Sequence, residues 1–409
     1  MSDYWKQVGR VFSGTVVAQA IPVLTTLFVA RLIAPAVFGE FSVWLGLVMI
    51  ASVIVTARFE TALAVESDGY RRKLVLLGTA VTATGISLIL SVAIVSLVVF
   101  EPGVFPANMS SKQLALVGPT ALLVACSQVI QSWFAAEGWY DDLSLFRIAQ
   151  AVGIAGLQLT ASLVAPSADT LSLAYGIGVL LALSLASSRR KHVPRINVIR
   201  VRVATRRVWT THRRFAVYSL PADSINTAAS HLPAIVLAAR FGSEVAGHFA
   251  MAMTILGAPI ALLGKSVLDV FKRHAASAFR MRGECRVEYR QTFIVLAAGS
   301  FTLLFIAVPG LRVVVIALLG DNWAETASIG IALLPVFLLR FVASPLSYMV
   351  YIAGKQHWDL FWQLCLVVVI AAALVLPADL DAVLLAYSLG YSTLYVFYLF
   401  LSYRLSRGA

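Results

Sequence analysis

Residues 29–41 read VARLIAPAVFGEF, and residues 238–250 read AARFGSEVAGHFA. Each stretch contains a small residue, an arginine, a short break and then a Gly-x-Phe triplet. The Pro and Gly residues of both stretches suit a tight turn between two helices. When Gly39 is aligned with Gly247, the chain divides into two parts of similar length and order. The echo therefore predicts a duplicated architecture, with an equivalent pair of helices in each half.

The composition is that of a membrane protein. The chain has 409 residues, of which 60% are hydrophobic and 13% are charged, and its mean hydropathy is +0.86. Apolar runs of about 20 residues, long enough to cross a hydrocarbon core of roughly 30 Å as a helix, recur along the whole chain. We therefore predict an all-α, polytopic membrane protein with about twelve transmembrane helices. The predicted spans lie near residues 11–33, 40–64, 74–100, 113–136, 145–165, 169–187, 216–240, 245–271, 292–318, 326–352, 359–376 and 381–402.

The charge pattern indicates topology. A net charge of +12 could suggest nucleic-acid binding, but the cations cluster in segments on one side of the predicted spans. With both termini in the cytoplasm, roughly 25 of the 32 Lys and Arg residues fall on the cytoplasmic side, as the positive-inside rule expects. Glu137 and Arg147, which flank the turn AEGWYDDLSLF, are expected in a solvated loop. Nucleic acid is therefore excluded as a partner.

Duplication and charge together define the predicted domains. Residues 1–188 form an N-terminal six-helix bundle, residues 189–215 a basic cytoplasmic linker, and residues 216–409 a C-terminal six-helix bundle. The two bundles have the same orientation and are pseudo-symmetric. Parallel repeats of this kind are a common transporter design, with a central site between bundles that rock against each other.

About four cations lie inside the predicted spans, where an unpaired charge costs several kcal/mol, and three of them lie deep in their spans. Arg58 lies 19 residues after Gly39, and Lys265 lies 18 residues after Gly247. Each half therefore places a cation at a similar depth of its second helix. Arg340 falls near the middle of the tenth span. These three residues are candidates for binding an anionic substrate.

Carboxylates and other polar side chains accompany these cations. Glu60 follows Arg58 by two positions, about 200° around a continuous helix, so the two are not expected to pair on one surface. Lys265 and Asp269 are four residues apart, and either an ion pair or a substrate role fits them. The segment PADSINTAASHL places a polar face on the seventh span, which either lines a hydrophilic path or joins two helices by hydrogen bonds. That face carries Asp223, Asn226, Thr227, Ser230 and His231.

No motif for catalysis is present in the sequence. There is no phosphate loop of Walker type, no HExxH and no His-carboxylate cluster in an outer loop. Cys126 and Cys365 lie in apolar spans and Cys285 in a cytoplasmic loop, so neither a disulfide framework nor a metal site is indicated. We therefore expect no enzymatic activity, no cofactor and no bound metal.

Three blocks of sequence resemble a known family over nearly the whole chain. They are VARLIAPAVFGEFSVW with TARFETALAV, the long block from SLPADSINTAASHL to VFKRHAA, and the block from LLGDNWAETASIG to GKQHWDLFWQ. The chain resembles the bacterial oligosaccharide flippases of the Wzx type, polysaccharide biosynthesis proteins of the multidrug/oligosaccharidyl-lipid/polysaccharide exporter superfamily. The resemblance implies a V-shaped pair of six-helix bundles in the bacterial inner membrane. It implies alternating-access transfer of undecaprenyl-pyrophosphate-linked oligosaccharide from the cytoplasmic to the periplasmic leaflet, for surface polysaccharides such as O-antigen or exopolysaccharide.

The resemblance also assigns roles to residues. Arg58 in TARFE matches an Arg-x-Glu pattern of the family, and Arg340 in LLRFVASPLS matches a cation, while Lys265 falls where the family often has a polar residue. With Asn226 and His231 of the polar face, these form the expected substrate-binding set. Glu60, Asp223 and Asp269 are candidates for ion coupling or gating. The partners implied are the lipid-linked oligosaccharide, membrane lipids, a polysaccharide polymerase and chain-length proteins.

Two other functions compete with this interpretation. An ion-coupled multidrug exporter of the same superfamily would need an acid-lined cavity for cationic drugs, whereas the charges deep in these spans are mostly basic. A membrane-embedded polysaccharide polymerase or ligase would need a long outer loop with Arg and His, and the predicted outer loops are short.

Overall fold

The computed structural model describes residues 21–67, 69–100, 109–188 and 198–408. Some side chains within these ranges also lie outside the description: those of residues 188, 198, 199, 261–266, 269, 270 and 356. Every regular element in the described ranges is a helix, and no strand occurs there. The predicted all-α class is therefore confirmed. Nine of the described helices are long and apolar enough to cross a membrane, which makes the chain a multi-pass membrane protein.

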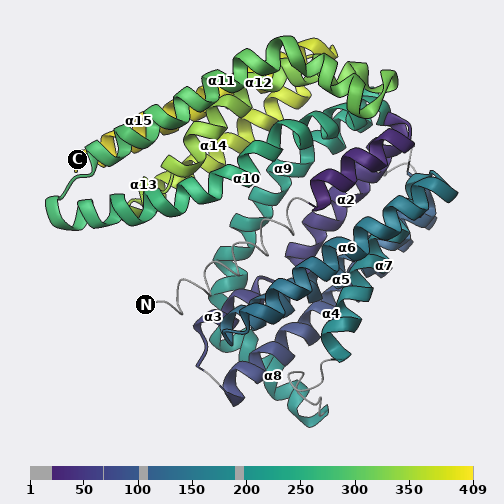
Figure 1. Cartoon of the computed structure of the whole chain (residues 1–409). Helices are drawn as coiled ribbons and strands as arrows, with labels where there is room; N and C mark the ends of the chain where they lie inside the picture. Colours follow the sequence, from purple (N-terminus) through teal and green to yellow (C-terminus); the bar gives the residue numbers. More distant parts are fainter. Residues whose placement is uncertain (1–20, 68, 101–108, 189–197, 409) are drawn as a thin grey trace. The chain divides into compact units, whose positions relative to one another are not determined.

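The chain forms two compact units, Met1–Ala246 and Gly247–Ala409, whose helices are labelled in Figure 1. The first unit contains a helix over Ile21–Leu32, α2 (Pro35–Thr56), η1 (Phe59–Thr61), α3 (Ala62–Val65), α4 (Tyr70–Phe100), α5 (Ser111–Ala136), α6 (Tyr140–Val164), α7 (Ala168–Ser188), α8 (Val198–Thr211), η3 (Phe215–Ser219) and α9 (Leu220–Phe241). The helix α10 (Ser243–Arg282) begins at the end of the first unit. The second unit continues with α11 (Arg286–Leu319), η4 (Asp321–Trp323), α12 (Ala324–Leu346), α13 (Met349–Ile352), α14 (Gln356–Val375) and α15 (Leu380–Ser406).

The helix α9 packs along α2, and both belong to the first unit. A Cβ added at Gly46 of α2 would lie 3.2 Å from the Cβ of His231, so the two helices approach closely at this glycine. Ala238 of α9 is buried in the same contact. The predicted division placed residues 216–246 with the C-terminal bundle, but the first compact unit includes them because α9 buries one face against α2. Residues 189–197 of the predicted linker lie outside the described residues.

The two echoed stretches occupy equivalent places in their helices. Gly39 is the fifth residue of α2 and Gly247 is the fifth residue of α10. Both glycines are therefore helical, and the prediction that they form the turns is wrong. The chain turns instead just before each helix, at residues 33–34 and at Gly242, whose φ of 95° lies in the region that favours glycine.

The phenylalanines of the two Gly-x-Phe triplets make matching contacts. The rings of Phe41 in α2 and Tyr175 in α7 have centroids 6.4 Å apart. The rings of Phe249 in α10 and Tyr387 in α15 have centroids 5.9 Å apart. In each half, the second helix of the echoed pair therefore packs an aromatic ring against the last helix. This equivalence supports a true internal repeat.

The helix α2 ends at a strained break. It stops at Thr56, and the next two residues, Ala57 and Arg58, have φ values of 48° and 60°. Non-glycine residues in this left-handed region cost on the order of 1–3 kcal/mol each, so the surroundings must enforce the conformation. Ala57 and the following Phe59 are fully buried in a hydrophobic cluster. The predicted continuous span over 40–64 is therefore wrong, because packing breaks the helix at Arg58.

The short helix α8 docks on α4 in the first unit. A Cβ added at Gly78 of α4 would lie only 2.5 Å from the carbonyl oxygen of Ala204 in α8, so glycine permits this close approach. The indole Nε1 of Trp209 donates to Thr82 Oγ1 at 3.2 Å. Part of the basic segment predicted as a linker is thus packed against the first unit.

Side-chain contacts to one carboxylate hold the end of α8 to the loop between α3 and α4. Both Nη2 of Arg207 and the ring Nε2 of His212 contact Glu66 Oε2, at 3.1 and 3.0 Å. Burial alone raises the pKa of Glu66, but the hydrogen bonds of His212 and Arg207 outweigh it and lower that pKa to about 2. The carboxylate therefore stays ionised at physiological pH, and its contacts to Arg207 and His212 hold α8 in place.

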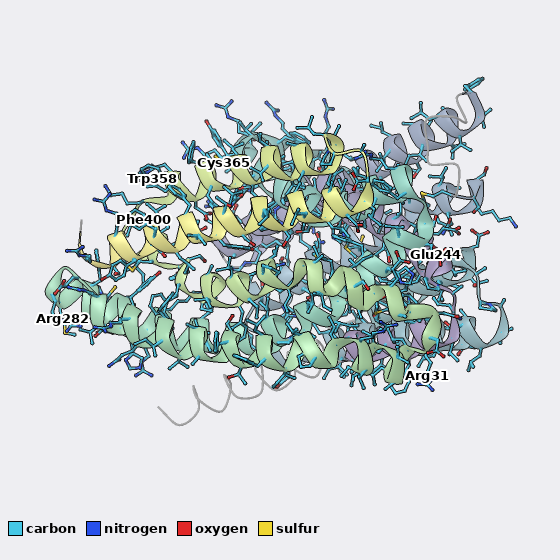
Figure 2. The ribbon with its side chains drawn as sticks, turned by 90° about the horizontal axis from the view of Figure 1, so that it is seen from above. Arg31, Glu244, Arg282, Trp358, Cys365 and Phe400 are labelled. Atoms are coloured by element: carbon cyan, nitrogen blue, oxygen red, sulfur yellow. The ribbon has the colours of Figure 1, made fainter. Side chains whose placement is uncertain are left out.

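The second unit has a charged turn and apolar outer surfaces. Arg282 lies at the end of α10 (Figure 2), and its guanidinium pairs with Glu288 of α11. Trp358 of α14 and Phe400 of α15, also labelled in Figure 2, are exposed. Exposed apolar side chains on long apolar helices are what a lipid environment favours.

Candidate functional site

The helix break brings Arg58 between two carboxylates in the first unit. Its Nη1 lies 2.9 Å from Oε1 of Glu60, and its Nε lies 2.7 Å from Oδ2 of Asp223. Neither contact has hydrogen-bond geometry, so both are charge contacts. The expectation that Arg58 and Glu60 do not pair is wrong, since it assumed a continuous helix. Asp223 reaches the same guanidinium from the first turn of α9.

Arg58 lines a polar cavity of about 310 Å³ within the first unit. The cavity lies between the end of α2, η1, α5 and α6. Its polar lining consists of Arg58, Glu60, Thr61, Gln128, Gln131, Ser132 and Arg147. A cavity with these donors, in helices that are otherwise apolar, is suited to a polar or charged ligand.

A second arginine, Arg147, faces the same cavity. It belongs to α6, and its Nε donates to Oε1 of Gln131 at 2.9 Å. The expectation that Arg147 lies in a solvated loop is therefore wrong. Glu137, which shared that expectation, is partly buried and pairs with Arg72 at 3.1 Å. The two arginines give the cavity donors on two of its walls.

Gln128 and Gln131 were not among the predicted site residues. They lie three residues apart in α5, so they share one helix face, and both line the cavity. Gln128 Nε2 also donates to Ser52 Oγ at 3.4 Å. Two glutamines at this spacing inside an apolar span were a sequence signal that could have identified this wall.

Two carboxylates contact Arg58. They belong to Glu60, which also lines the cavity, and to Asp223. Glu60 is 3% exposed, and a buried carboxylate without a partner would cost several kcal/mol. An anion that enters the cavity must therefore compete with carboxylates for Arg58. This arrangement can link anion binding to release of the contact between Arg58 and α9.

The predicted polar face of α9 does not act as one surface. Asp223 contacts Arg58, and His231 lies against α2 at Gly46. Asn226 and Ser230 are exposed, and Ser230 Oγ donates to the carbonyl oxygen of Asn226 at 3.1 Å. The structure therefore brings Asp223 to the site and leaves Asn226 away from it.

Arg340 occupies a different environment, in the second unit. It lies in α12, which packs against α15, and it interacts electrostatically with Tyr387, Tyr391 and Tyr395 of α15. The tyrosines recur every four residues, with ring centroids 5.5 and 5.1 Å apart. No carboxylate in the described part of the chain forms an ion pair with Arg340. The cation therefore lies beside an aromatic stripe with its charge uncompensated there.

The remaining predicted residues lie in α10. Lys265 and Asp269 are in this 40-residue helix, but their side chains fall outside the described residues. Their backbone is helical without interruption, whereas Arg58 lies in a helix break. The predicted equivalence of Lys265 and Arg58 therefore does not extend to the backbone.

Comparison with solved structures establishes the fold. A structure described as "Lipid II flippase MurJ, inward closed conformation" matches with a TM-score of 0.72 and 14% identity, over 96% of this chain and 87% of that chain. An inward-facing MATE family multidrug transporter of the MOP superfamily matches with a TM-score of 0.68 and 14% identity, over 96% and 98%. The MATE transporter DinF-BH matches at 0.63 with 15% identity, over 97% and 93%. At such identities the likeness concerns the fold alone.

Comparison with protein families identifies the chain more specifically. The comparison with curated proteins finds no match. Residues 28–328 match the family described as polysaccharide biosynthesis protein. This match covers both echoed stretches, the arginine cavity of the first unit and the start of α12. The chain therefore belongs to the polysaccharide biosynthesis protein family, with the helical fold that MurJ and the MATE transporters share.

Proposed function

We propose that the chain transfers undecaprenyl-pyrophosphate-linked oligosaccharides across the bacterial inner membrane, from the cytoplasmic to the periplasmic leaflet. The observation that carries this proposal is the polar cavity lined by Arg58 and Arg147 in an apolar, membrane-spanning unit. Membership of the polysaccharide biosynthesis protein family supports a glycan substrate. The likeness to a lipid II flippase is in keeping with a lipid-linked one.

The chemistry of the site suits this substrate. A sugar pyrophosphate cannot cross hydrocarbon alone, because its charges and hydroxyls would lose their hydrogen bonds without replacement. Arginine offers planar, paired donors that match phosphate oxygens. Arg58 and Arg147 provide two such groups in one cavity, and Gln128 and Gln131 add neutral hydrogen-bonding groups. The prenyl chain can remain in the lipid.

We propose that the substrate and Asp223 compete for Arg58, and that this competition gates the transfer cycle. Without substrate, Arg58 holds Asp223 and thereby joins the end of α2 to the start of α9. A pyrophosphate that binds Arg58 displaces this carboxylate and breaks the charge contact between the end of α2 and the start of α9. Because Glu60 and Asp223 both contact Arg58, we assign ion coupling or gating to these carboxylates. An inside-negative potential assists outward movement of an anion by about 2.3 kcal/mol per charge per 100 mV.

The second unit contributes Arg340. Its charge lies beside the tyrosine stripe of α15, without a carboxylate partner in the described residues. We assign Arg340 to the substrate's anionic group. Both termini would lie in the cytoplasm, and a polysaccharide polymerase and chain-length proteins would act on the transferred product.

A cationic-drug exporter is the second candidate function. Glu60 and Asp223 place two carboxylates at the same site, and MATE multidrug transporters share the fold. Both carboxylates contact Arg58, however, so their charge is already compensated. A drug cation would have to displace a guanidinium from them, whereas an anion that displaces a carboxylate from Arg58 also meets Arg147 in the same cavity. The geometry therefore favours the anionic substrate.

Deleting the gene from its host tests the proposed function. We expect a prenyl-pyrophosphate-linked oligosaccharide to accumulate on the cytoplasmic leaflet and the corresponding surface glycan to disappear. Mass spectrometry of extracted lipids would identify the oligosaccharide, and an intact copy of the gene should restore the glycan. Unchanged lipid-linked pools and unchanged glycan in the deletion strain would rule out this function.

A further inference from the structure

A second cavity in the first unit has a different character from the arginine cavity. It has a volume of about 350 Å³ and lies between α4, α5, α7 and α8. Its walls are mostly apolar, including Leu74, Leu77, Ala83, Val129 and Ile130. This volume falls within the range of roughly 300–1,000 Å³ that is typical of small-molecule sites. The cavity is large enough for part of a lipid chain.

The helix α5 separates the two cavities. Gln128, Gln131 and Ser132 line the arginine cavity, whereas Val129 and Trp133 line the apolar one. The two sets lie on different faces of the same helix. A ligand of the apolar cavity therefore need not be the ligand of the arginine cavity.

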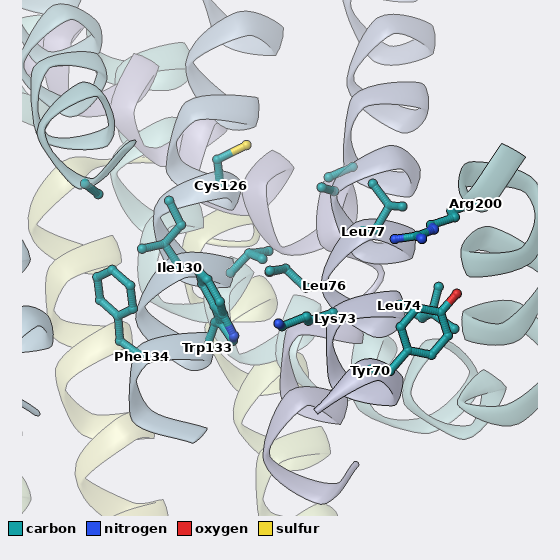
Figure 3. Close-up of a pocket in the computed structure, with 14 residues that line it drawn as sticks. Tyr70, Lys73, Leu74, Leu76, Leu77, Cys126, Ile130, Trp133, Phe134 and Arg200 are labelled. Atoms are coloured by element: carbon teal, nitrogen blue, oxygen red, sulfur yellow. The ribbon is translucent and has the colours of Figure 1, made fainter. Parts of the chain in front are cut away.

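Two cations lie at the apolar cavity. Lys73 comes from α4 and Arg200 from α8, and Figure 3 shows both extending toward the space between the helices. Arg200 is held over the ring of Tyr70, with its Cζ 5.7 Å from the ring centroid. Both cations are exposed, and neither pairs with a carboxylate among the described residues. They are available to an anionic group.

A buried donor in the same cavity lacks an acceptor. Trp133 is 2% exposed, and its Nε1–H has no hydrogen-bond partner within the described part of the chain. Buried polar groups normally have partners, so an orphaned N–H calls for an explanation. In Figure 3 the indole nitrogen is turned toward the amino group of Lys73. A ligand oxygen between them would satisfy both donors.

We propose that this cavity binds an anionic phospholipid of the surrounding membrane. One acyl chain lies against the apolar walls, the headgroup phosphate lies at Lys73 and accepts the indole N–H of Trp133, and Arg200 adds positive charge at the side of the cavity near Tyr70. Basic pockets between membrane helices on the cytoplasmic side bind acidic lipid headgroups, and Lys73 lies in one of the basic clusters that the charge pattern places there. Because α8 supplies Arg200, the bound lipid would also stabilise the docking of α8 on α4.

Lipid binding to the purified full-length chain in a neutral detergent tests this proposal. Dioleoylphosphatidylglycerol, dioleoylphosphatidylcholine and undecaprenyl phosphate would be titrated separately. Native mass spectrometry would count bound lipid, and thermal unfolding would report stabilisation. We expect the phosphatidylglycerol to bind at one saturable site and to raise Tm, with at least tenfold weaker binding of the phosphatidylcholine. The assay involves no transport, so its outcome is independent of the proposed function.

Paired variants separate the site from a general charge effect. The double variant Lys73→Gln/Arg200→Gln should lose the saturable binding. The matched control Arg71→Gln/Arg202→Gln removes two exposed cations from the same two helices, neither of which lines the cavity, and should keep it. Trp133→Phe retains an aromatic ring without the N–H donor, and should weaken phosphatidylglycerol binding by about tenfold.

Three results would overturn the proposal. Equal phosphatidylglycerol affinity in the two double variants would show that Lys73 and Arg200 contribute no more to binding than other surface cations of the same helices. Binding of undecaprenyl phosphate in preference to phosphatidylglycerol would assign the cavity to a prenyl lipid. Unchanged affinity in Trp133→Phe would remove the indole from the site.

Discussion

Replacing Arg58 with alanine abolishes the surface glycan if Arg58 binds the pyrophosphate. A hydrogen bond to a charged group contributes about 1.5–3 kcal/mol, so the loss of a paired contact weakens substrate binding by more than about a hundredfold. Arg58→Lys keeps the charge without the paired donors and should retain intermediate activity. The measurement is the amount of surface glycan in a deletion strain that carries each variant, with the membrane level of the protein as reference.

A structural effect of this substitution must be separated from a loss of binding. Arg58→Ala leaves Glu60, which is 3% exposed, without its contact to Arg58, and removing one partner of a buried ion pair costs about 3–5 kcal/mol. The double variant Arg58→Ala/Glu60→Gln removes that unpaired charge. We expect this variant to insert normally and still to make no glycan. Glycan restored by the second substitution would show that Arg58 serves only the fold.

Replacing Arg340 with alanine should remove the glycan without lowering stability. No described carboxylate depends on Arg340, so its loss leaves no buried charge unpaired and relieves the cost of a cation in an apolar helix. Export should nevertheless fall to background, because we assign this cation to the substrate's anionic group. Glycan level and Tm of the purified chain are the two readouts.

Arg312→Ala is the matched control for Arg340. Arg312 is an exposed arginine of the same unit, on α11, and its replacement should leave the glycan unchanged. Wild-type glycan in the Arg340 variant would remove this residue from the substrate site. An equal loss in both variants would point to a general effect of charge on the second unit.

Most of the fold could be predicted from the sequence, because apolar runs and an internal repeat are local, periodic features of the chain. Apolar run lengths predicted the helical class, and the Gly-x-Phe echo identified positions that proved equivalent, with Phe41 and Phe249 packed against tyrosines at the ends of their halves. The unit boundary was missed because it depends on which helix α9 packs against. The helix α9 packs against α2 through the close approach at Gly46, and the periodicity of the sequence does not predict this contact.

Only some of the site residues could be predicted from the sequence. Arg58 and Asp223 were selected because charges inside spans are costly, and the structure brings them together. The pairing of Arg58 with Glu60 depends on two left-handed, non-glycine residues that no propensity predicts. Arg147 was assigned to a loop because the start of α6 is polar, yet its side chain faces the cavity. In both cases tertiary packing determines where the side chain lies, and a sequence pattern does not show that packing.

Transport by the purified chain in lipid vesicles would distinguish a lipid-linked glycan flippase from a cationic-drug exporter. The vesicles would contain a fluorescent prenyl-pyrophosphate-linked oligosaccharide, and an impermeant glycosidase outside would report its appearance in the outer leaflet. A permanently cationic dye would be followed in parallel. We expect the chain to move the acidic lipid-linked glycan, the variants Arg58→Ala/Glu60→Gln and Arg340→Ala to move none, and the dye to stay untransported. Movement of the dye without movement of the glycan would contradict the proposed function.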